Sequence, residues 1–173
     1  MALTLERFAA DCRDALTAQP GTEGRKKVRD LVQQALTDKA FVAQYIPDGT
    51  PERQILFEDP DLGFTILAHG YTGPKSSKPH DHGPSWAIYG QAAGETIMTD
   101  WDCLARPDGT APGKAKYVRD YVMKPGDAYL YDIGVLHSPE RKGATRLLRI
   151  EGMNMDRVKR LPYEAVQLNP AAE

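Results

Sequence analysis

The succession of short β-rich runs in the second part of the chain constrains its fold more than any other feature. From about Gln54 onward, runs of β-branched and aromatic residues alternate with turn residues such as Asp59-Pro60 and Gly126-Asp127. The runs are QILFED, GFTILAHGY, SWAIYG, GETIMTDW, KYVRDYVM, DAYLYDI and TRLLRIEGMNM. Because no helical pattern separates these seven runs, they predict a mainly β sandwich or barrel. In such a fold the inner strand faces converge and can surround a ligand.

The residues before this region have helical spacing instead. Apolar side chains recur every three or four positions over residues 5–16 and 28–36, and a third helical piece covers residues 39–45. A chain of 173 residues suits one domain with a single core. We therefore expect residues 1–48 to form a helical segment that packs on a β barrel made by residues 49–173, with no linker between them.

Composition excludes several classes of partner. The formal net charge is −2, so no overall positive field favours nucleic acid or an anionic membrane surface. The basic run Arg25-Lys26-Lys27 is typical of the solvated face of a helix. No apolar stretch approaches the roughly 18 residues of a membrane-spanning helix, and the charged N-terminal run MALTLERFAADCRD is unlike a signal peptide. We expect a cytoplasmic protein in which Cys12 and Cys103 are both thiols.

Three of the four histidines indicate a metal site. His80 and His82 are separated by one residue in KPHDHGPSWAIYGQAAGE, so on an extended segment both point to the same side. His137 lies in a second glycine-containing strand context, GDAYLYDIGVLHSP. Three imidazoles from two strands would bind one face of an iron, nickel, copper or zinc ion and leave its other positions open. The alternative is that the first two are polar turn residues and the third a hydrogen-bonded core histidine; His69 can face either way.

These two segments also carry a family resemblance. KPHDHGPSWAIYGQAAGE resembles the first motif of the cupin superfamily, and PGDAYLYDIGVLH resembles the second, with the match covering roughly residues 54–155. The resemblance implies a double-stranded β-helix, or jelly-roll, barrel. Many cupins have a glutamate ligand four or five residues after the second histidine, but Trp86 and Ala87 occupy those positions here. A three-histidine site is similar to that of the cysteine-dioxygenase-type branch, including 3-mercaptopropionate dioxygenase, whose members use iron(II) and O2.

The resemblance also implies substrate-binding residues. Arg53 lies 27 residues before His80, close to the position of an arginine that binds the substrate carboxylate in that branch; the alternative is a solvated loop arginine. Trp86 shares the parity of His82, so on a regular strand it would face inward and line the pocket. Tyr131 is a second pocket residue, with a hydroxyl that can donate to oxygen at the metal. Ordinary barrel core is the alternative for both aromatic residues.

Two departures from that branch bear on the substrate. The segment RIEGMNMDR has neither the histidine nor the tyrosine of the branch's serine–histidine–tyrosine relay, and no cysteine adjoins the histidine pair to form a cysteine–tyrosine crosslink. The chain is therefore similar to an offshoot of the branch, in which the iron chemistry persists and the surroundings of the metal differ.

The expected function is a mononuclear non-haem iron(II) dioxygenase that acts with O2 on a small molecule such as a thiol carboxylic acid. Two alternatives stay open: a cupin isomerase or hydrolase that uses zinc, nickel or another divalent ion as a Lewis acid, and a non-catalytic cupin that binds a small ligand. No nucleic acid or membrane is an expected partner. The barrel edge or the N-terminal helices offer a surface for a homodimer, although no apolar stripe in the sequence favours one of these surfaces over the other.

Overall fold

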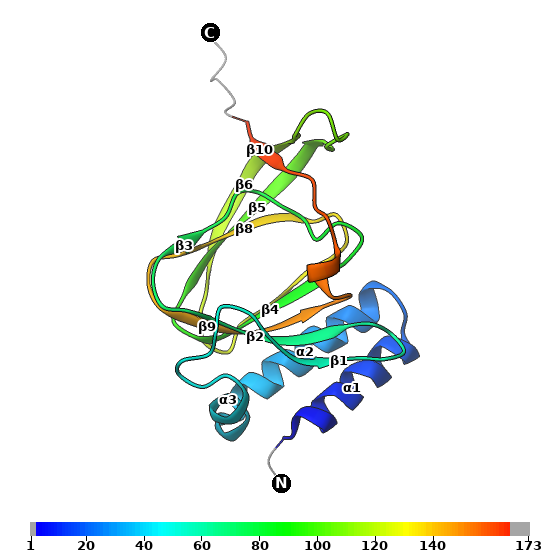
Figure 1. The fold of residues 1–173 in the computed structure, drawn as a ribbon, viewed down its shortest axis with the longest axis vertical. Coiled ribbons are helices and arrows are strands. Elements are labelled where there is room, and N and C mark those ends of the chain that lie inside the picture. The colour runs from blue at the N-terminus through cyan, green and yellow to red at the C-terminus, as the bar shows by residue number, and fades with distance from the viewer. Residues whose placement is uncertain (1–2, 167–173) are drawn as a thin grey trace.

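The computed structural model describes residues 3–166 and has three helices followed by strands (Figure 1). The helices are α1 (Leu5–Ala18), α2 (Thr22–Thr37) and α3 (Lys39–Tyr45), as the apolar spacing predicts. The strands are β1 (Gln54–Glu58), β2 (Thr65–Tyr71), β3 (Lys75–Ser76), β4 (Ala87–Ala93), β5 (Thr96–Ala105), β6 (Gly113–Met123), β7 (Ala128–Tyr131), β8 (Leu136–Arg141), β9 (Thr145–Glu151) and β10 (Tyr163–Ala165). A short 3-10 helix, η1 (Met155–Arg157), follows β9.

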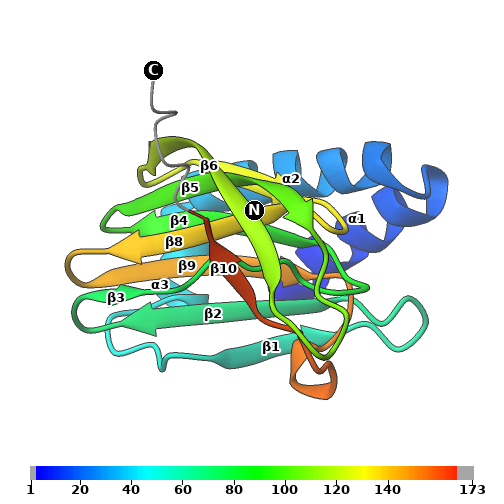
Figure 2. The ribbon, with the colours of Figure 1, turned by 90° about the horizontal axis from the view of Figure 1, so that it is seen from above.

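The strands form two five-stranded sheets that face one another. Their orders are β1-β2-β9-β4-β7 and β10-β6-β5-β8-β3, and every pairing is antiparallel except that of β10 with β6. Strands distant in sequence lie side by side, as β4 does with β9 and β5 with β8. Figure 1 shows how the two curved sheets enclose an interior, and Figure 2 shows the same strands from above. The chain is therefore mainly β, a two-sheet jelly-roll barrel preceded by N-terminal helices.

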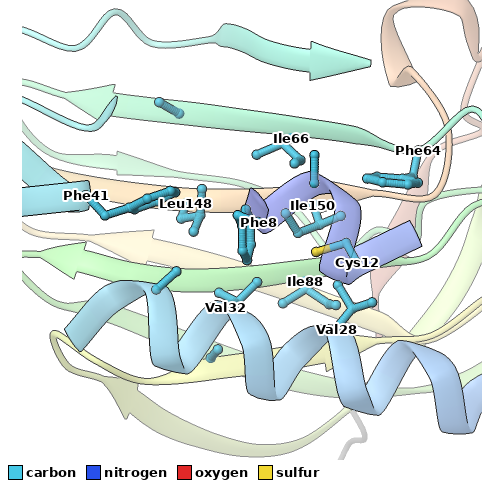
Figure 3. Packing of buried hydrophobic residues seen from close by; sticks show 14 of the residues in the cluster. Phe8, Cys12, Val28, Val32, Phe41, Phe64, Ile66, Ile88, Leu148 and Ile150 are labelled. Atoms are coloured by element: carbon cyan, nitrogen blue, oxygen red, sulfur yellow. The ribbon is translucent and has the colours of Figure 1, made fainter. Parts of the chain in front are cut away.

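Helices α1 and α2 cover the outer face of the first sheet (Figure 1). Phe8 and Cys12 of α1 and Val28 of α2 are buried against Ile88 and Ile150 of the sheet (Figure 3). Side chains alternate along a strand, so even-numbered residues of β4 and β9 face the helices and odd-numbered ones face the barrel interior. A second, smaller cluster of Tyr89, Met98, Tyr131 and Leu147 lies on that interior side.

Strands β5 and β6 are long, and a short strand adds to them near the end of the described residues. β5 continues to Ala105 and β6 begins at Gly113, so only residues 106–112 lie between them. The chain after Pro162 forms β10, which pairs with β6. Cys103 consequently lies on a strand; it is exposed, Cys12 is buried, and both are free thiols as expected. No helix among residues 3–166 combines the length and apolarity that a membrane span requires.

Candidate metal centre

Backbone pairing brings the three histidines together. His137 is the second residue of β8, and His80 lies in the segment between β3 and β4. The two residues exchange backbone hydrogen bonds, with N–H to carbonyl distances of 3.0 Å in both directions. His82, two positions after His80, points to the same place. One metal-binding atom from each of the three side chains lies within 4.8 Å of the other two.

The imidazole rings present their Nε2 atoms to a common point. The Nδ1 of His80 lies 2.9 Å from the carbonyl of Lys78, and that of His137 lies 3.2 Å from the carbonyl of Val135. Both Nδ1 atoms must therefore carry the hydrogen that they donate, which leaves each Nε2 lone pair free for a metal. The Nε2 atoms of His82 and His137 are 3.2 Å apart. Two neighbouring ligands about 2.1 Å from one ion would have roughly this separation.

Burial keeps all three imidazoles neutral, which is the form that binds metals. Desolvation lowers the pKa of His80 to about 4, and it lowers the pKa of His82 and His137 well below their ordinary value. The Arg149 guanidinium is the second cause for His82, and the nearby imidazole of His80 is the second cause for His137. A divalent ion therefore does not have to displace protons from imidazolium groups near neutral pH.

The hydrogen bond between Arg149 and His82 would have to break for a metal to bind His82. Nη2 of Arg149 lies 3.3 Å from Nδ1 of His82, and a guanidinium can only donate, so the hydrogen of this neutral ring lies on Nε2, toward His137. Metal binding through Nε2 requires the hydrogen on Nδ1 instead. The three histidines fit a metal on the condition that the guanidinium of Arg149 moves away from His82.

Tyr89 directs its hydroxyl toward the histidine cluster, and the sequence analysis missed it. Its hydroxyl lies 3.4 Å from Nε2 of His82 and 3.3 Å from Nε2 of His137. The guanidinium of Arg149 lies over its ring, 4.4 Å from the centroid. Parity counted from the first residue of β4 would have found Tyr89, because Ala87, Tyr89 and Gln91 share the interior face.

The expectation that Trp86 lines the pocket was wrong. Trp86 packs in the core beneath the helices, and Arg25 of α2 lies 5.8 Å from its ring centroid. The parity argument from His82 assumed a regular strand, but a turn intervenes: Gly83 has a φ of 58° and β4 begins only at Ala87. This turn reverses the side on which the following residues point.

Tyr131 lies inside the barrel next to the cluster. Its ring stacks on that of His137 with centroids 4.0 Å apart, and its hydroxyl is 2.6 Å from the hydroxyl of Tyr121. The Tyr131 hydroxyl is thus already engaged, while that of Tyr89 faces the metal ligands. A substrate-binding role for Tyr131 stays a prediction.

Arg53 lies at the same cavity but already has acidic partners. Both of its terminal nitrogens are 3.1 Å from the carboxylate of Glu151, and its Nε is 2.9 Å from Asp156. The side chain is only 26% exposed, so it is not a freely solvated loop arginine. Its role in binding a substrate carboxylate also stays a prediction, and its existing partners would compete with such a ligand.

One cavity extends from the histidine cluster to Arg53. Its volume is about 550 Å³, and it is lined by His80 and Tyr89 at the histidine cluster and by Arg53, Arg141 and Arg149 farther along. His69 also faces it, with Nδ1 2.6 Å from the carbonyl of Glu52, but is not part of the cluster. A cavity of this size suits a small molecule.

Comparisons with known proteins leave the activity open. No family model matches the chain, and neither does any curated protein. A cupin superfamily protein from Desulfitobacterium hafniense has a TM-score of 0.44 at 15% identity, over 59% of this chain and 76% of that one. A cupin-2 domain protein from Shewanella frigidimarina gives 0.40 at 15% identity, over 57% and 76%. KdgF from a Halomonas species gives 0.44 at 14% identity, over 61% and 82%.

Proposed function

We propose that the chain is a mononuclear non-haem iron(II) dioxygenase acting on a small molecule, with His80, His82 and His137 as the iron ligands. One observation carries the proposal: three neutral imidazoles converge, with ligand atoms within 4.8 Å of one another, and one of them, that of His80, lines a small-molecule cavity. A facial set of three nitrogen ligands leaves positions on iron(II) at which O2 and a substrate can bind.

The protein's own residues would hold and order the reactants. The carbonyls of Lys78 and Val135 fix two of the imidazole rings through their Nδ1 atoms. The Tyr89 hydroxyl faces the same point as the ligand atoms and can donate a hydrogen bond there. Burial raises the pKa of Tyr89, so the hydroxyl keeps its proton near neutral pH. The enclosing sheets restrict the access of bulk water to this point.

The test is O2 uptake after anaerobic loading with iron(II), using a panel of thiol carboxylic acids as substrates. We expect near-stoichiometric iron and substrate-dependent uptake, with both oxygen atoms entering the product. The matched control is His137→Ala, which should lose iron and uptake together. Full iron occupancy with no uptake for any member of a broad panel would contradict the dioxygenase assignment.

The same donors also suit a different chemistry. Three histidines without a carboxylate are a ligand set that zinc uses, and zinc would act as a Lewis acid in an isomerase or hydrolase. Turnover under strictly anaerobic conditions by the zinc-loaded protein would favour this alternative. Saturable ligand binding without product in either assay would favour a non-catalytic binding protein.

A further inference from the structure

A buried arginine on the strand of the third histidine is not used by the proposed metal centre. Arg141 is the last residue of β8, four positions after His137, so both side chains emerge from the same face of the strand. Its relative exposure is 4%, and it lines the cavity that the histidine cluster adjoins. The α-carbons of the two residues are roughly 13 Å apart along the strand.

Arg141 lacks the partner that a buried guanidinium normally has. The buried ion pairs of the cavity join Arg53 and Arg149 to Glu151, and within residues 3–166 no carboxylate lies within 4.0 Å of Arg141. Its Nε is buried without a hydrogen-bond partner in the same part of the chain. The guanidinium lies over the ring of Tyr71 instead, 4.3 Å from the centroid. A cation–π contact offsets only part of the cost of removing a full charge from water.

The other charges of the cavity do not compensate for Arg141. Glu151 is completely buried and already serves both Arg53 and Arg149. Glu52, at the rim, is paired with Lys75. The lining as a whole has six basic side chains, Arg53, Lys75, Lys78, Arg141, Arg149 and Arg160, and three acidic ones, Glu52, Glu151 and Asp156. The cavity is therefore electropositive, and its deepest unpaired charge is Arg141.

We infer that Arg141 is the anion-binding residue of this cavity and that its ligand is a small molecule carrying an oxyanion. The guanidinium supplies a planar pair of donors that matches the two oxygens of a carboxylate. Binding of the oxyanion by Arg141 does not depend on the proposed function. Only the binding of the ligand's other end to a metal rests on it. It assigns to Arg141 the role that the sequence analysis expected of Arg53, because Arg53 is already neutralised by Glu151 and Asp156.

The test compares two probes of similar size and shape, 3-mercaptopropionate and the neutral 3-mercaptopropionamide, of which only the first carries an oxyanion. Each is titrated calorimetrically into zinc-loaded protein at fixed ionic strength, so that no oxidation intervenes. Wild type should prefer the acid. Arg141→Gln should weaken binding of the acid about ten- to hundredfold and leave binding of the amide unchanged, as expected for one charged hydrogen-bonded pair. Arg141→Lys should recover part of the loss, because it restores the charge without the planar donors.

The control is Arg119→Gln, because Arg119 is exposed on β6 and pairs with Asp100 outside the cavity. It should bind both probes as wild type does. Equal affinity of wild type for acid and amide, or full retention of acid binding by Arg141→Gln, would overturn the inference. Competition by inorganic phosphate at concentrations similar to those of the acid would identify a phosphoryl group, rather than a carboxylate, as the preferred oxyanion.

Failure of the anion subsite is distinguishable from failure of the metal centre. Zinc content is measured first for every variant, and the comparison of the two probes is repeated on metal-free protein. Missing zinc would count against the metal centre alone. The preference of the metal-free protein for the acid over the amide would still test the role of Arg141. A second readout is thermal stability without ligand: Arg141→Met should raise Tm, because it removes an uncompensated buried charge. A clear fall in Tm together with unchanged acid binding would show a structural arginine and overturn the inference.

Discussion

At the residue scale, the chemistry of the candidate site depends on which side-chain atoms are already occupied. The Nδ1 atoms of His80 and His137 are held by backbone carbonyls, which leaves Nε2 as the metal-binding atom of each ring. Tyr131 has its hydroxyl engaged by Tyr121, whereas the hydroxyl of Tyr89 faces the histidine cluster. These assignments separate residues that sequence reasoning can only group together as pocket aromatics.

Tyr89→Phe should separate metal binding from turnover. The substitution removes one hydroxyl near two ligand atoms and preserves the buried ring, so metal content should stay at the wild-type level. If the hydroxyl donates a hydrogen bond during the reaction, kcat should fall about tenfold or more. Metal analysis and steady-state O2 uptake measure the two effects. Tyr129→Phe, at a half-exposed position on β7, serves as control, and an unchanged kcat in both variants would contradict a role for Tyr89.

His69 should make stability depend on pH in the acid range. Burial, followed by the charge of Arg149, lowers its pKa from 6.5 to about 3 in the folded protein. The unfolded state therefore takes up a proton below pH 6.5 that the folded state does not, and stability falls as pH falls from 6.5 toward 3. Each pH unit in this window costs about 1.4 kcal/mol for this one group.

Urea unfolding of metal-free wild type and His69→Gln at pH 7.5 and 5.5 tests this expectation. The other histidines titrate in both proteins and cancel in the difference. The loss of stability on acidification should be about 1.4 kcal/mol smaller in the variant. An equal loss in both proteins would mean that His69 is protonated in the folded state.

At the element scale, the residue at which a strand begins determines which of its side chains face the barrel interior and the site. Helix boundaries and most strands follow from apolar spacing and turn residues, and so does the mainly β sandwich or barrel class, whereas the jelly-roll form was implied only by the family resemblance. The turn at Gly83 does not follow from them, and it reverses the parity that placed Trp86 inside and left Tyr89 unnoticed. A one-residue shift of register moves every side chain to the opposite face, so local pattern alone cannot identify the lining of a barrel.

The close packing of α2 against β4 is a further consequence of strand register. A Cβ added at Gly90 would lie 2.5 Å from Cγ1 of Val32 and 2.9 Å from Cδ1 of Leu36, both on α2. Gly90→Ala should therefore destabilise the fold by about 1–3 kcal/mol through overpacking. Gly143→Ala, where a Cβ meets nothing within 4 Å, should change stability by less than about 0.5 kcal/mol. Chemical denaturation measures the free energy of unfolding of both variants. Equal values would show that α2 can move away from β4 at little cost and would contradict the expected overpacking.

At the scale of the whole molecule, the helices and the first sheet share one core. Phe8 of α1 is 1% exposed and packs edge-on against Phe41 of α3, with ring centroids 5.5 Å apart (Figure 3). The same cluster includes Ile66, Ile88 and Ile150 of the sheet. The long-range pairing of His80 with His137 of β8 therefore depends on a barrel whose outer face the helices cover. Sequence can indicate the amphipathic helices, but not which sheet they cover.

Phe8→Ala should show that residues 1–48 and the barrel unfold together. Loss of this buried ring should cost about 3–5 kcal/mol. The loss should appear in a single transition, whether unfolding is followed by helical circular dichroism or by tryptophan fluorescence, because Trp86 lies in the core shared with the helices and Trp101 lies in the barrel. Two separate transitions, with only the helical signal shifted, would contradict a shared core.

The measurement that tests the central claim most directly is the metal content of protein purified without a histidine tag. Wild type should contain near-stoichiometric divalent transition metal, and His82→Ala should lose most of it. His69→Gln is the matched control, because His69 is another buried histidine of the same cavity outside the cluster, and it should retain the wild-type content. Full metal content in His82→Ala would contradict the three-histidine centre.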